Sequence, residues 1–158
     1  MVNLLSTGIL IVALAAGEGN AIKPEAVTVS MVAVRATIEG REEKHFDAGL
    51  EAIRKAVADL PYDTYRKVKS SKTPAPFDQE TKIGINKEYS LYVTPLAKKS
   101  DGRIRMKARI EMQPKDEKKK AINTHVTTAL LKPGKKLKFC GGMKADGGEL
   151  VVIISIED

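Results

Sequence analysis

Four cationic side chains at every second position are the residues of this sequence best placed to do chemistry. They are Arg103, Arg105, Lys107 and Arg109. Residues two apart on a β-strand share one face and lie about 6.5–7 Å apart, so these four would form a cationic ladder. A ladder of this kind attracts polyanions or an acidic protein. Lys136 and Lys138, or alternatively Arg66, Lys67 and Lys69, are candidates to extend it from a neighbouring strand. The alternative is an ordinary solvated strand face that discourages edge pairing.

Other residue types that support catalysis or ligand binding are sparse in this sequence. His45 and His125 are the only histidines, and no metal-ligand spacing accompanies them. The sequence has no Gly-x-Ser-x-Gly motif, the turn that exposes a nucleophilic serine. The glycine pairs at 141–142 and 147–148 lack the Gly-Lys-Ser/Thr ending of a phosphate loop. We therefore predict that the protein is not an enzyme and has no catalytic, cofactor-binding or metal-binding residues.

The cationic ladder belongs to a strand predicted by strict alternation. Over residues 103–112 charged and apolar side chains alternate, which places the apolar ones on one face of a sheet and the charged ones on the other. Residues 88–96 alternate in a similar way. The link between the two segments ends in Asp101-Gly102, a strong hairpin signal because Gly adopts positive φ without steric cost. We expect an antiparallel hairpin.

The remainder of the chain after this hairpin predicts three more strands. They cover residues 121–131, 137–140 and 150–156, and Pro133-Gly134 makes the turn between the first two. The last segment, LVVIISI, is apolar on both faces. This pattern is typical of an interior strand that is covered on each side.

A fixed order of short motifs runs through this half of the chain. The motifs are Leu91-Tyr92-Val93-Thr94-Pro95, Asp101-Gly102-Arg103-Ile104, Thr124-His125-Val126-Thr127-Thr128, Pro133-Gly134, Gly141-Gly142 and the apolar residues 150–156. Their order and spacing resemble the conserved β-core of the bacterial secretin family, whose members form outer-membrane rings in secretion and pilus systems. The resemblance covers less than half of the chain. It implies a related sheet topology and a stand-alone relative rather than a pore, because these residues do not include a secretin's ring modules and membrane-crossing hairpins.

The first half of the chain predicts a strand, a helix and a second strand. Residues 27–38 are rich in β-branched side chains and apolar on both faces, which indicates a central strand. Over residues 46–60 apolar side chains recur at steps of three and four, which predicts an amphipathic helix that Pro61 ends. A strand is expected over 62–71. Residues 70–78 contain two prolines and are expected to form a loop.

The N-terminal 21 residues have the composition of a secretory signal peptide. Their apolar run, residues 4–16, is too short to span a bilayer, which takes about 20 residues, and small residues follow it. No Lys or Arg precedes Lys23, so the α-amino group would supply the usual positive charge. We expect a periplasmic or secreted protein without a lipid anchor, since no cysteine follows the apolar run closely. The alternative is a buried N-terminal strand or helix.

The length and net charge of the chain indicate the number of domains and the kind of partner. A chain of 158 residues with a net charge of +7 supports one domain that favours anionic partners. We predict an α+β domain over residues 22–158, with strand–helix–strand at 27–71 and an antiparallel secretin-like region at 80–158. One amphipathic helix would pack on a mostly antiparallel, curled sheet of about six to eight strands.

The functional prediction is a non-enzymatic structural or interaction module of a bacterial envelope assembly, without a cofactor. Its partners would be envelope or secretion-system proteins, or a second copy bound through a sheet edge. The alternative is a soluble binder of anionic polymers through the basic face. Nucleic acid is not an expected partner, because no aromatic side chains interleave with the cations and export separates the two.

Overall fold

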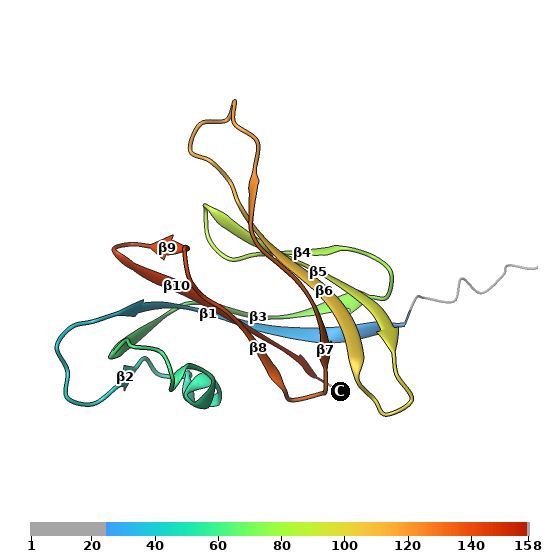
Figure 1. The fold of residues 1–158 in the computed structure, drawn as a ribbon, viewed down its shortest axis with the longest axis horizontal. Helices are drawn as coiled ribbons and strands as arrows, with labels where there is room; N and C mark the ends of the chain where they lie inside the picture. Colours follow the sequence, from blue (N-terminus) through green and yellow to red (C-terminus); the bar gives the residue numbers. More distant parts are fainter. Residues whose placement is uncertain (1–24, 158) are drawn as a thin grey trace, which may run out of the picture.

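The computed structural model describes residues 25–157, which form two β-sheets (Figure 1). Sheet A has the strand order β2-β3-β1-β10-β8, with β9 paired to β10. Its strands are β1 (Ala26–Thr37), β2 (His45–Phe46), β3 (Thr64–Pro76), β8 (Lys136–Phe139), β9 (Lys144–Ala145) and β10 (Gly148–Glu157). Sheet B has the order β4-β5-β6-β7. Its strands are β4 (Thr81–Gly84), β5 (Tyr89–Lys98), β6 (Ile104–Met112) and β7 (Ile122–Leu131).

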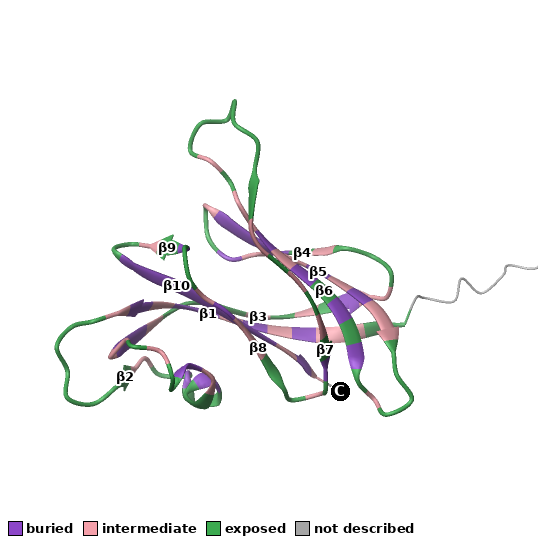
Figure 2. Ribbon diagram, viewed as in Figure 1, coloured by how far each residue is buried: buried purple, intermediate pink, exposed green. Residues whose placement is uncertain are grey.

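The main core lies between the two sheets. Met31 of β1 and Ile154 of β10 belong to the same buried apolar cluster as Leu91 of β5 and Ile110 of β6. The alternation predicted for residues 103–112 is confirmed: Ile104, Met106, Ala108 and Ile110 are buried, and the residues between them are exposed or half-buried. Figure 2 shows this alternation along β6. The predicted hairpin is also confirmed, because β5 and β6 pair antiparallel.

β1 and β10 are interior strands whose two faces are both buried. β10 lies between β1 and β8, as its two-sided apolar sequence predicted. Its side chains at 150, 152, 154 and 156 enter the core between the sheets. Val151 and Ile153 instead face outward and form a second core with Val34 of β1 and with Leu50, Ile53 and Val57 of the β2–β3 connection.

The predicted amphipathic helix over residues 46–60 is wrong. Its place is taken by β2 and two single turns of 3-10 helix, η1 (Glu51–Ile53) and η2 (Lys55–Val57). The described chain contains no helix of seven or more residues, so the predicted α+β class, with one helix on a curled sheet, is replaced by a mostly β fold with two sheets.

The apolar spacing of this segment fits both kinds of helix. Leu50, Ile53 and Val57 are buried against sheet A, as an amphipathic element requires. The hydrogen bonds Ile53 N to Leu50 O (3.1 Å) and Leu60 N to Val57 O (3.1 Å) span three residues, not four. Gly49, with a φ of 83°, cannot continue a right-handed helix. Two turns of 3-10 helix therefore bury the same apolar residues that predicted an α-helix.

The loop predicted over residues 70–78 is also wrong, because β3 continues to Pro76. Pro74 lies opposite Thr28 and Pro76 opposite Ala26 in the β1–β3 ladder. These positions are two apart, so both missing N–H groups face away from β1. On that side β3 is paired only at Thr64 and Tyr65, by β2, and is otherwise an edge of sheet A. A free edge is where a strand tolerates proline.

Candidate functional site

The predicted cationic ladder lies on the outer face of sheet B, opposite the core. The side chains of Arg105 and Lys107 are exposed, and that of Arg109 is half-buried. The register of sheet B places each of these three cations opposite one residue of β5 and one residue of β7, which gives three cross-strand rows. Their members are Tyr92–Arg109–Val126, Thr94–Lys107–Thr128 and Ala97–Arg105–Leu130.

Arg109 is bound on every side by its neighbours. Its guanidinium donates to both carboxylate oxygens of Glu80 (2.9 and 3.1 Å), to Glu111 Oε2 (2.7 Å) and to Asn123 Oδ1 (3.1 Å). Its Cζ lies 3.9 Å from the centre of the Tyr92 ring. The hydrogen bond from Arg109 holds the pKa of Glu80 below its usual value, and that of Arg109 is raised in turn. Arg109 therefore ties β5, β6, β7 and the residue that precedes β4 together rather than offering a charge to a ligand.

Arg103 is likewise neutralised, at the turn that precedes β6. Its Nε lies 2.7 Å from Asp101 Oδ2, and its backbone N–H donates to Asp101 Oδ1 (3.1 Å). These bonds, led by the backbone donor, lower the pKa of Asp101. Among residues 25–157, Arg105 and Lys107 make no ion pair. Of the four predicted cations, only these two are exposed and without an ion pair in this range.

Lys136 and Lys138 do not extend the ladder. Both are on β8 in sheet A, where Lys138 lies opposite Ile153 and therefore on the outer face of that sheet. Lys138 Nζ bonds Asp59 Oδ1 (2.6 Å), which lowers the pKa of that carboxyl. The two groups of cations thus lie on opposite outer surfaces of the sandwich, and the prediction that they would form one face is wrong.

Two exposed apolar residues share the face of Arg105 and Lys107. Val126 and Leu130 of β7 are 59% and 41% exposed. Val126 lies opposite Arg109 and Leu130 opposite Arg105. The sequence did not single them out, because residues 122–131 mix apolar and polar side chains on both faces of the strand. Glu80 carried no signal either, because it lies 29 residues before Arg109 in the sequence.

The histidines and glycines that could suggest catalysis have structural surroundings. His125 Nε2 lies 3.2 Å from the carbonyl oxygen of Cys140, and its ring meets Phe139 edge-on. Gly141, Gly142 and Gly147 have positive φ angles at turns. No group of three or more potential metal ligands gathers among the residues that the structure describes.

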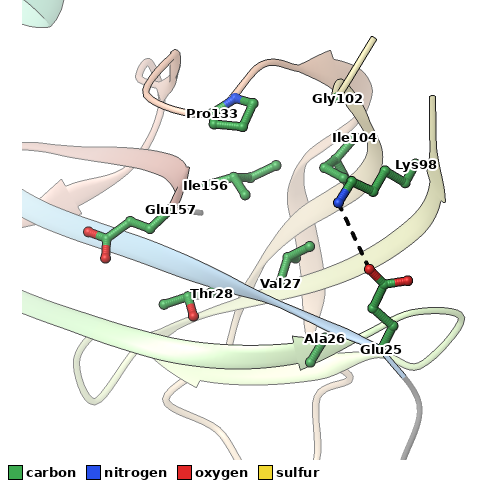
Figure 3. A pocket seen from close by; sticks show the side chains of 10 residues that line it. All are labelled: Glu25, Ala26, Val27, Thr28, Lys98, Gly102, Ile104, Pro133, Ile156 and Glu157. Atoms are coloured by element: carbon green, nitrogen blue, oxygen red, sulfur yellow. Dashed lines mark ion pairs between the residues drawn. The ribbon is translucent and has the colours of Figure 1, made fainter. Parts of the chain in front are cut away.

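A hollow of about 270 Å³ lies at one end of the sandwich, where β1 and β10 approach the β5–β6 hairpin (Figure 3). Val27, Ile104 and Ile156 form its apolar lining. Lys98 Nζ reaches across it to Glu25 Oε1 at 3.9 Å. Because its one lysine already has a carboxylate beside it, the hollow offers a weaker anion site than the outer face of sheet B.

Comparisons of the chain with protein-family models, with curated proteins and with solved structures give no match. None of the helices in the described residues is long and apolar enough to cross a membrane.

Proposed function

We propose that this chain is a non-enzymatic interaction module that binds an acidic protein partner through the outer face of sheet B. The observation that carries the proposal is the combination of two exposed, unpaired cations, Arg105 and Lys107, with the exposed apolar side chains of Val126 and Leu130. Protein interfaces combine apolar contact with arginine in this way. Charge complementarity would steer the partner to this face.

The cellular setting is part of the same proposal. The signal-like residues 1–21, which lie outside the described residues, and the secretin-like order of motifs support an exported component of a bacterial envelope assembly. N-terminal sequencing of the protein isolated from its native cells would test export. A start at residue 1 in the isolated protein would contradict it.

The binding test compares charge reversals of equal size at two places. Arg105→Glu with Lys107→Glu changes the candidate face, and Lys118→Glu with Lys119→Glu changes the loop between β6 and β7 by the same net charge. Size-exclusion chromatography after mild extraction from native cells should show the wild type and the loop variant in a complex with envelope protein, and the face variant alone. Elution of the wild type as a free monomer, or equal losses in both variants, would contradict the proposal.

The second candidate is a binder of anionic polymers, favoured by the same two unpaired cations. A heparin column distinguishes it, because polymer binding is salt-dependent and needs no apolar contact. Retention that falls on reversal of Arg105 and Lys107, but is unchanged by Val126→Ser, would favour the polymer. Arg109 is not a suitable target for either test, because its substitution would disturb the ion pairs that join the strands of sheet B.

A further inference from the structure

Three of the four sheet edges in the described residues carry features that block pairing with another strand. β4 and β8 have only four residues each, and β8 contributes Lys136 and Lys138. β3 is long but contains Pro74 and Pro76, along with several lysines. Short length, lysine and proline are the devices by which natural sheets keep their edges unpaired.

The edge of β7 is different. This strand has ten residues, none of which is proline, lysine, arginine, aspartate or glutamate. No strand of residues 25–157 pairs with it on the side away from β6. A register shift at Thr124 interrupts its ladder, which leaves a regular stretch of seven residues, 125–131. An exposed edge of this length with apolar side chains is a template for another strand.

We propose that the β7 edge pairs antiparallel with β7 of a second copy of this chain. Thr128 is the centre of the regular stretch, so a two-fold axis at Thr128 gives the greatest overlap. This axis places Thr128 opposite its own copy and Val126 opposite Leu130 of the partner. The two exposed apolar residues on the outer face then pack side by side across the paired strands, and Thr–Thr and apolar cross-strand pairs are favourable. A two-fold dimer uses one self-complementary patch of this kind.

The charge of the protein does not oppose this arrangement at the interface. β7 carries no charged residue between positions 122 and 131. The two unpaired cations of the outer face, Arg105 and Lys107, are on β6, and the two copies of β6 would lie three strand spacings apart, about 14 Å. That separation exceeds the Debye length of about 8 Å at physiological ionic strength. The absence of charge on β7 therefore means that no like charges face each other along the paired strands.

Sedimentation velocity of the purified full chain over a range of concentrations tests the dimer. We expect reversible dimerisation of the wild type, and at least a tenfold weaker dimer for Thr128→Lys and for Thr128→Glu, because each variant places like charges opposite each other. An equimolar mixture of the two variants should restore the dimer as a heterodimer. Ser70→Lys, at an exposed position on the protected β3 edge, adds the same charge as Thr128→Lys and should leave the wild-type constant unchanged.

Amide hydrogen exchange locates the interface independently of any variant. Protection of β7 amides should rise with protein concentration. The proposal is overturned by a wild type that stays monomeric up to about 1 mM, by association without protection of β7, or by a mixture that does not restore the dimer. If both Thr128 variants fail to fold, the concentration-dependent exchange of the wild type still decides the question.

Discussion

Replacing Arg109 by Ala should destabilise the fold much more than the same change at Arg105. The two residues are two positions apart on β6 and share the outer face of sheet B. Arg109 bonds Glu80, Glu111 and Asn123 and covers the Tyr92 ring, whereas Arg105 has no ion pair among residues 25–157. Arg105→Ala is therefore a matched control for the loss of one arginine from this face.

The size of the effect follows from the separate contacts of Arg109. The cation–π contact with Tyr92 at 3.9 Å stabilises by about 1 kcal/mol. The pair with Glu80, whose side chain is 45% exposed and well screened, contributes about 0.5 kcal/mol. The charged hydrogen bond to Glu111, between side chains that are 20% and 17% exposed, contributes about 1.5 kcal/mol. Together they amount to about 3 kcal/mol, or a Tm lower by about 6–12 °C in a domain of this size.

The remaining hydrogen bonds of Glu111 limit the stability that is lost when Arg109 is replaced. Without Arg109 it still accepts hydrogen bonds from Gln113 Nε2 (2.7 Å) and Tyr92 Oη (3.3 Å), so its charge is not left without donors. Urea denaturation and thermal melts of both variants measure the difference in the free energy of unfolding. Arg105→Ala should stay within about 0.5 kcal/mol of the wild type. Equal losses at the two positions would refute the assignment of Arg109 as the residue that joins the strands of sheet B.

Two further predictions concern other parts of the fold. Asp63 accepts hydrogen bonds from the backbone N–H groups of Glu39, Gly40 and Arg41, which lower its pKa to about 2, with the bond from Glu39 the largest cause. Because the pKa of Asp63 is lower in the folded than in the unfolded state, the ionised carboxylate stabilises the fold fully above the unfolded pKa near 4. This stabilisation is lost as the pH falls through about 2. Melts of Asp63→Asn between pH 2 and 5 should lack this part of the wild-type decline; an identical decline would contradict the prediction. Gly148→Ala should cost about 1–3 kcal/mol, because a Cβ there would lie 2.7–2.8 Å from atoms of β1, whereas Gly84→Ala, with its nearest neighbour at 3.8 Å, should cost much less. Equal unfolding free energies for the two glycine variants would rule out this steric cause.

The sequence predicts the faces of strands well and their partners poorly. Alternation over residues 103–112 and the two-sided patterns of β1 and β10 identified the buried faces of these strands, because a period of two is a local property. Ile38 is the exception, since it follows β1 and is 70% exposed. Whether strands share a sheet depends on pairing between distant residues. β10 pairs with β1, more than a hundred residues earlier, which the local pattern does not encode. The predicted single curled sheet is therefore two sheets, and β8 to β10 join the N-terminal strands in sheet A.

The candidate site shows the same division between local and distant information. The two-residue spacing placed Arg105, Lys107 and Arg109 correctly on one face. Some of the acids that pair with the ladder are close to it in the sequence, and one is distant. Asp101 is two residues from Arg103 and Glu111 two residues from Arg109, so both were visible in the sequence. Glu80 reaches Arg109 only because β4 lies beside β5. Counting cations along one strand thus overestimated the free charge by two.

The two proposals concern the same strands and are therefore linked. Thr128 and Leu130, which would contact a second copy, end the rows that contain Lys107 and Arg105. Pairing of β7 would bring the two copies of Lys107 to about 14 Å from each other on one continuous face. An anionic partner that reaches both copies would bind the dimer more tightly than the monomer, and linkage requires that it strengthen the dimer by the same factor. A dimer dissociation constant that heparin leaves unchanged would show that the two surfaces act separately, because a shared partner must favour the paired state.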